Sequence, residues 1–126
     1  MISQNSHTVE NLFSDKPIQL KLFQNIKQFI QSIGQVESSV SKTQVAFKNH
    51  RQFAWVWLPM PRDTKRPPNS IVLSFSLEKH LNSPQIVQVV EPYPGRWMHH
   101  VIIQKSSDLN EEVQGWLKES YQLSKG

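Results

Sequence analysis

The chain has 126 residues, a net charge of +4 from 14 basic and 10 acidic side chains, and no cysteine. This length suits a single domain that folds without a metal or a disulfide. Without cysteine, disulfides, thiolate metal sites and cysteine nucleophiles are excluded. The N-terminus lacks a signal-peptide pattern, and no apolar run approaches the roughly 20 residues of a membrane-spanning helix. We therefore expect a cytoplasmic domain with no membrane segment.

A helix is predicted after a polar N-terminal arm. Residues 1–14 are expected to be a partly ordered arm, and residues 15–126 a single domain. Asp15-Lys16-Pro17 has the form of a helix start, because aspartate can cap the first turn and proline fits within it. The apolar stripe that follows has helical spacing: Ile18, Leu22, Ile26, Phe29, Ile30 and Ile33. Gly34 is predicted to end the helix as its C′ residue.

A block of strands is predicted next, because the apolar period changes to two. The predicted strands are 36–41, 43–48, 53–58, 70–77, 86–90 and 97–103. In the third strand, Phe53, Trp55 and Trp57 are assigned to one face. Both faces of that strand are apolar, which predicts a central strand covered on both sides. Its aromatic residues are interpreted as core, with a stacking platform as the alternative.

The connections and the last helix complete the predicted fold. Tyr93-Pro94-Gly95-Arg96 suits a type II turn, while four prolines within 59–68 exclude strand pairing in that segment. Asp108 and Glu111 form a variant capping box, and the buried stripe comprises Leu109, Val113, Trp116, Leu117 and Tyr121. We predict an α+β fold: an antiparallel five- to six-stranded sheet flanked by an N-terminal and a C-terminal helix.

One candidate site is basic. Residues 42–66 hold six basic side chains and one acid, so this segment carries +5. If the strands form an up-and-down meander, the 59–69 loop and the 92–96 turn share one end of the sheet. This predicts an anion or nucleic-acid surface beside Tyr93 and Trp97, formed by Arg62, Lys65, Arg66 and Arg96. An ordinary solvated loop is the alternative.

A second candidate is a ligand pocket near the tight turn, formed by Glu91, Arg96, Trp97, His99 and His100. Such groups can perform acid–base chemistry near neutral pH. Adjacent strand residues face opposite sides, however, so His99 and His100 cannot chelate one metal together. Each imidazole is interpreted as structural, and an Arg96–Glu91 pair as a turn staple worth under about 1 kcal/mol.

Motifs that define enzymes are not found. There is no G-x-S-x-G elbow, and four unclustered glycines exclude a Walker loop and a dinucleotide fingerprint. His7, His50 and His80 show no ligand spacing. The sequence therefore disfavours an enzyme and predicts no metal and no cofactor.

Several landmarks carry a resemblance to a known family. They are Thr8-Val9-Glu10-Asn11-Leu12-Phe13 before a helix, Arg96-Trp97-Met98-His99-His100, and Asp108-Leu109-Asn110 leading to Trp116-Leu117 and Ser120-Tyr121. The chain, from about Thr8 to Ser124, resembles a bacterial family of small domains of unknown function. Some members are labelled transport proteins, and some lie beside restriction-type nuclease modules. Ser120 stands where the family more often has alanine. The resemblance implies the fold, a bacterial cytoplasmic setting and a slight preference for nucleic acid.

Three functional hypotheses follow. The first is a non-catalytic binding or accessory module for nucleic acid, another anionic partner or a protein. The second is a small-ligand binder or enzyme using Glu91, Arg96 and His99 or His100. The third is a homo-oligomer that pairs through an exposed edge strand.

Overall fold

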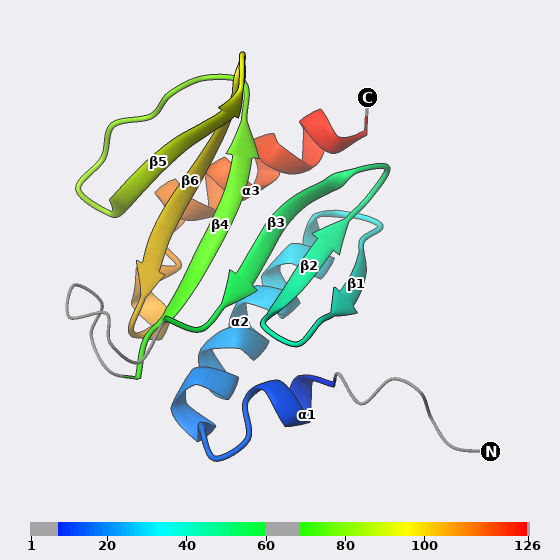
Figure 1. The fold of residues 1–126 in the computed structure, drawn as a ribbon, viewed down its shortest axis with the longest axis vertical. Helices are drawn as coiled ribbons and strands as arrows, with labels where there is room; N and C mark the ends of the chain where they lie inside the picture. Colours follow the sequence, from blue (N-terminus) through cyan, green and yellow to red (C-terminus); the bar gives the residue numbers. More distant parts are fainter. Residues whose placement is uncertain (1–7, 60–68, 126) are drawn as a thin grey trace.

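The computed structural model of the chain describes residues 8–59 and 69–125 (Figure 1). It confirms the predicted α+β class: one six-stranded antiparallel sheet and two long helices. The strands are β1 (Glu37–Val40), β2 (Gln44–Lys48), β3 (Gln52–Trp57), β4 (Ile71–Leu77), β5 (Ile86–Tyr93) and β6 (Arg96–Ile103). The helices are α1 (Val9–Leu12), α2 (Pro17–Ile33) and α3 (Glu111–Ser124), with a 3-10 turn at Ser106–Asp108.

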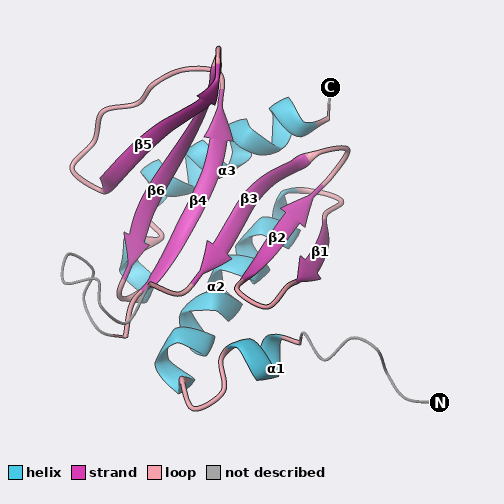
Figure 2. Ribbon diagram, in the orientation of Figure 1, coloured by secondary structure: helices cyan, strands magenta, loops and turns pink. Residues whose placement is uncertain are grey.

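Strand order departs from a simple meander. The order is β1-β2-β3-β4-β6-β5, so β5 lies at the edge and β6 lies between it and β4. Since β6 is antiparallel to both neighbours, β4 and β5 run in the same direction. The connection 78–85 therefore returns along the length of the sheet before β5 begins, as Figure 2 shows. The meander prediction was wrong at this step, and the turn at residues 94–95 lies at the opposite end from the one predicted.

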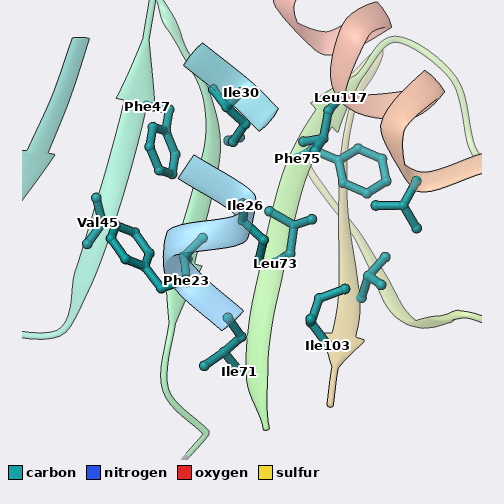
Figure 3. Close-up of a cluster of buried hydrophobic side chains, with 14 of the residues drawn as sticks. Phe23, Ile26, Ile30, Val45, Phe47, Ile71, Leu73, Phe75, Ile103 and Leu117 are labelled. Atoms are coloured by element: carbon teal, nitrogen blue, oxygen red, sulfur yellow. The ribbon is translucent and has the colours of Figure 1, made fainter. Parts of the chain in front are cut away.

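The main core lies between the sheet and helices α2 and α3, which pack against each other and against the central strands (Figure 2). Figure 3 shows the side chains that fill it, and those it labels are Phe23, Ile26, Ile30, Val45, Phe47, Ile71, Leu73, Phe75, Ile103 and Leu117. Full burial of a side chain of this size contributes about 1.5–3 kcal/mol. The apolar stripe of the helices, with a period of 3.6, and the apolar positions of the strands, with a period of two, form the two surfaces that meet here.

A β-bulge interrupts the alternation of β3. Phe47 pairs with Ala54 and Lys48 pairs with Gln52, which leaves Phe53 as the extra residue. The bulge turns Phe53 into the helix-covered core, where its ring lies 5.7 Å from that of Tyr121. The assignment of Phe53 to one face with the two tryptophans was therefore wrong, because an extra residue reverses the pleat at that point.

The ends of α2 differ from the predicted pattern. Lys16 is the N-cap and makes no side-chain capping bond, while Asp15 adopts a positive φ of 60° outside the helix. Gly34 does end the helix, but its φ of 171° is extended rather than left-handed. A Cβ on Gly34 would meet the Tyr121 ring, at 2.7 Å from Cζ. Glycine is required there by the close approach of α3, and not by a C′ conformation.

The last helix begins later than predicted. Asp108 Oδ2 accepts from the N–H groups of Gln104 and Lys105 and so closes the 3-10 turn. The N-cap of α3 is Asn110, whose side chain accepts from Val113 N–H at 3.0 Å. The predicted Asp108–Glu111 capping box was wrong, because a separate 3-10 turn uses the aspartate. A Cβ on Gly115 would meet open space, so close packing does not require glycine at that position.

The opposite face of the sheet is built differently. Among the described elements, both long helices lie on the first face (Figure 1), and β3 lies between β2 and β4, the central position that the sequence predicts. Val72, Ser74 and Ser76 of β4 are nevertheless buried, while Trp55 and Trp57 of β3 are half-buried. Within residues 8–59 and 69–125, no helix has the length and apolar character that a membrane crossing requires.

Residues 9–13 of the predicted arm are ordered into α1 and the turn that follows. The Thr8 side chain accepts from Asn11 N–H at 3.0 Å and caps this short helix. Phe13 is buried, and its ring lies 5.2 Å from that of Phe23 in α2. Phe13 therefore joins this segment to the main core.

Candidate functional site

Of the four predicted basic residues, Arg96 alone lies among the residues that the structure describes. Arg62, Lys65 and Arg66 lie outside the described residues. The strand ends that precede and follow their segment, Trp57 and Ile71, lie at one end of the sheet. Arg96 begins β6 at the other end, where Trp97 pairs with Leu77. The predicted placement of Arg96 beside this segment was wrong, because it assumed a meander in which the 78–85 connection joins neighbouring strands.

A pocket of about 180 Å³ occupies the end of the sheet that carries Arg96. The last β3–β4 pair at this end is Ala54 with Phe75, and the bulge residue Phe53 of β3 comes directly beyond it. The C-terminal turn of α3 and the β5–β6 turn complete the walls. The polar lining comprises Arg51, Gln52, Ser76, Glu78, Tyr93, Arg96, Ser120 and Ser124. Bulges frequently accompany functional sites because they redirect side chains in this way.

Arg96 reaches across the pocket from β6. Its Nη1 donates to the Tyr93 hydroxyl at 3.0 Å, and its Nη2 donates to the Gln52 carbonyl at a longer 3.4 Å. The guanidinium carbon also lies 5.8 Å from the centroid of the Tyr93 ring. Both of these acceptors are neutral, so the bonds orient the guanidinium and leave its positive charge in place.

Arg51 approaches from the β2–β3 turn. Its Nη2 donates to the Leu123 carbonyl at 2.8 Å, and its backbone N–H donates to the Ser124 carbonyl at 3.1 Å. These carbonyls end α3, where a positive charge is favourable to the helix dipole. Arg51 therefore has a structural role, and it also brings a second guanidinium to the pocket lining.

Ser120 is the least expected part of the lining. Its side chain is 1% exposed, and its Oγ has no hydrogen-bond partner within the described chain. An unsatisfied buried hydroxyl costs about 1–3 kcal/mol. Ser124, one turn later, donates its hydroxyl to the Tyr121 carbonyl. The floor of the pocket thus contains a donor that the fold itself does not use.

Glu91 closes the tight turn instead of pairing with Arg96. Its Oε2 accepts from Gly95 N–H at 3.0 Å. The φ of Gly95 is +82°, which fits the predicted type II turn. The predicted Arg96–Glu91 staple is replaced by this backbone bond, because the turn presents an N–H directly to the carboxylate. Glu78 is the carboxylate in the pocket lining.

His99 lies on the helix-covered face and is fully buried. Its Nε2 accepts from Leu81 N–H at 3.1 Å, its ring stacks on Phe75 at 5.2 Å, and its Nδ1 has no partner among the described residues. Burial lowers the pKa of His99 below 6.5, and nearby His80 lowers it further. The imidazole is therefore held neutral inside the core.

His100 lies on the other face. Its Nδ1 is 2.6 Å from Ser74 Oγ, which also accepts from Trp57 Nε1 at 2.8 Å. The His100 and Trp57 rings meet edge to face at 5.7 Å. Ser74 Oγ contacts both of these side chains, so its hydroxyl has a structural role.

The five predicted pocket residues consequently do not gather in one place. Glu91 lies in the turn, His99 lies in the core, and His100 lies on the far face; Trp97 contacts His80, with ring centroids 5.0 Å apart. Of the five, Arg96 alone lines the pocket. The part of the chain that the structure describes contains no group of three histidine, cysteine or acidic residues placed to hold a metal. Sequence reasoning missed Arg51 and Ser120 as site residues, because only the fold brings these distant positions together.

Comparison with known proteins gives one match. The profile of the family described as Domain of unknown function (DUF5655) matches residues 9–124, which is nearly the whole chain. No curated protein and no solved structure matches it at the same standard of significance.

Proposed function

We propose that this chain, which belongs to the DUF5655 family, is a non-catalytic module that binds an anionic group of its partner in the pocket between Arg51 and Arg96. The supporting observation is that two guanidiniums from different turns line one small pocket, each oriented by neutral acceptors. Guanidinium groups bind carboxylate and phosphate in a bidentate fashion, and such charge-assisted bonds are about twice as strong as neutral ones.

The size of the pocket indicates that it encloses one anionic group of a partner and not a whole ligand molecule. Ligand pockets usually enclose roughly 300–1,000 Å³, whereas this pocket encloses about 180 Å³. The remainder of an anionic partner would therefore lie outside, next to the 55% exposed ring of Tyr93. An aromatic ring beside a cationic phosphate site suits single-stranded nucleic acid, whose bases stack on such rings.

Nucleic acid is accordingly the partner we propose, in the bacterial cytoplasm that the resemblance implies. Arg62, Lys65 and Arg66 are proposed as a separate cationic contribution, because their segment connects strand ends far from Arg96. Each phosphate contact adds to the salt dependence of binding. A triple alanine variant of these residues should reduce that dependence without removing the contribution of Arg96.

The test is binding of a fluorescently labelled single-stranded oligonucleotide, followed by anisotropy at low salt. Arg96→Gln should weaken binding at least about fivefold and flatten its salt dependence, because one phosphate contact is lost. Arg96→Lys, which keeps the charge but not the fork, should have an intermediate effect. Thermal unfolding of each variant separates weaker binding from loss of the fold.

Lys42→Gln is the matched control. Lys42 is exposed beside the start of β2, at the end of the sheet away from Arg96, and its replacement makes the same change in net charge. If Lys42→Gln weakened binding as much as Arg96→Gln, attraction to the whole protein would explain the data and the pocket would have no part. Absence of low-salt binding by the unmodified chain would refute the proposal entirely.

A further inference from the structure

Resting on the proposed function, we infer that the pocket accepts a terminal phosphate monoester, such as the 5′-phosphate of a nucleic acid strand, and not an internal phosphodiester. The inference comes from two features of the pocket: its position between two strands and its set of donors.

Position restricts what can enter. The pocket opens where β3 and β4 separate beyond the Ala54–Phe75 pair, and residues of α3 behind the sheet complete its lining. A group that approaches Ser120 must therefore pass the level of the strands. An internal phosphate is esterified on two sides, so it would need to bring two sugars into about 180 Å³. A terminal phosphate is esterified on one side only, so the rest of the strand can extend out through the opening of the pocket.

The donors match the oxygens of a monoester. A guanidinium has five N–H groups, so Arg51 and Arg96 keep donors beyond those that bind Leu123, Tyr93 and Gln52, and these can contact phosphate. Ser120 adds a buried hydroxyl with no partner in the described structure. A monoester has three unesterified oxygens and a charge of about −1.5 to −2 at pH 7, whereas a diester has two such oxygens and a single charge. Three donor groups in the lining of one small pocket therefore favour the monoester.

Two negative features oppose an anion here, and each is informative. The C-terminal carbonyls of α3 carry partial negative charge, which the Arg51 contacts to Leu123 and Ser124 offset. Glu78 is a carboxylate in the same lining. Its negative charge weakens the binding of every anion, and it weakens the binding of a doubly charged anion most. Glu78→Gln should therefore tighten binding of a monoester more than binding of a diester.

The experiment compares three oligonucleotides of one sequence: 5′-phosphorylated, 3′-phosphorylated and unphosphorylated. At least one phosphorylated form should bind about tenfold more tightly, because the terminal phosphate adds a charge-assisted contact. Inorganic phosphate should compete for the phosphorylated form and barely affect the unphosphorylated one. Free nucleoside monophosphate, used as a second competitor, distinguishes a strand end from a free nucleotide as the source of the phosphate.

Ser120→Ala supplies the sharpest variant. It removes a buried hydroxyl that has no partner in the described chain, so the fold should be retained, as thermal unfolding can verify. The variant should reduce the preference for the phosphorylated strand about threefold or more, while binding of the unphosphorylated strand stays unchanged. Ser76→Ala, at another buried serine of the lining, should have the smaller effect.

The outcomes separate the two proposals. Equal binding of all three oligonucleotides that still depends on Arg96 would overturn the monoester inference and leave the anion-binding function standing. Binding of none of them would overturn both. A preference for the phosphorylated strand that neither Ser120→Ala nor Arg96→Gln changes would place the phosphate elsewhere and overturn this pocket as the site.

Discussion

The two faces of the sheet are stabilised in different ways. On the face covered by α2 and α3, the central strands present Leu73, Phe75 and Val101 to apolar side chains of the helices, as Figure 3 shows for the first two. On the opposite face, the same strands present Val72, Ser74 and His100, and a chain of hydrogen bonds joins the serine to its neighbours. Packing dominates the first face, whereas hydrogen bonding has a larger share in the second.

Adjacent histidines illustrate the difference. His99 and His100 are consecutive residues of β6, and the strand alternation places them on opposite faces. His99 stacks on Phe75 in the core, and His100 contacts Ser74 and Trp57. Two residues of one type, one position apart, thus have unrelated surroundings, so a cluster in sequence is poor support for a cluster in space.

The largest expected effect compares two buried valines. Val101 and Val72 are both 0% exposed, but only Val101 belongs to the helix-covered core. Val101→Ala should lower the free energy of unfolding by about 2–3 kcal/mol, the sum of lost transfer free energy and a cavity. Val72→Ala should cost about 1 kcal/mol, because side chains without a helix layer above them can relax into the space.

Chemical denaturation of both variants checks this pair, with the transition slope confirming that the unfolded states are comparable. Equal losses would show that both faces are packed to the same density. The difference between the faces would then be one of composition alone.

The second prediction concerns the hydrogen bonds of the opposite face. Ser74→Ala removes the acceptor of Trp57 Nε1–H and the partner of His100 Nδ1. Two such bonds contribute about 1–2 kcal/mol together. Ser76→Ala is the control on the same strand and face, with an expected cost below about 0.5 kcal/mol. Equal costs would mean that the Ser74 contacts add nothing beyond burial, a result that tryptophan fluorescence at Trp57 can corroborate.

Local features of the fold could be predicted from the sequence. The helical stripe from Leu22 to Ile30 and the six alternating strands depend on periodicity alone, and they appear in the structure within one to three residues. The type II turn at Gly95 could also be predicted from the sequence, because proline and glycine determine the backbone conformation directly. Gly34 was assigned a helix-ending role, but its requirement arises from contact with Tyr121, 87 positions away in the chain.

The candidate site could be predicted only in part. Arg96 was recognised because a turn and a basic residue coincide in the sequence. Arg51 and Ser120 were missed, because their proximity depends on the bulge at Phe53 and on the return path of the 78–85 connection. Neither feature has a local signal: one extra strand residue and a long connection are each compatible with several registers and strand orders.

The smallest expected effect is a change in how steeply the free energy of unfolding depends on pH. It tests whether the helix-covered face holds His99 neutral. Burial, assisted by His80, lowers the pKa of His99 in the folded protein below the value of 6.5 in the unfolded chain. Above that value both states are neutral and His99 adds no pH dependence. As the pH falls below about 6.5, the unfolded state binds a proton that the folded state does not, so stability is lost progressively toward the folded pKa.

His99→Gln keeps an acceptor that can serve Leu81 N–H but cannot titrate. The variant should be less stable than the unmodified chain at pH 7.5, because the stacking on Phe75 is lost. The difference in the free energy of unfolding between the variant and the unmodified chain should narrow steadily between pH 6.5 and pH 5, as measured by denaturation at each pH. His80→Ala should also make the free energy of unfolding less dependent on pH. Its effect should be smaller, because burial is the larger cause of the lowered pKa of His99. Parallel curves for all three proteins would show that His99 takes up its proton equally well in both states, and hence that this face admits water where the packing indicates that it does not.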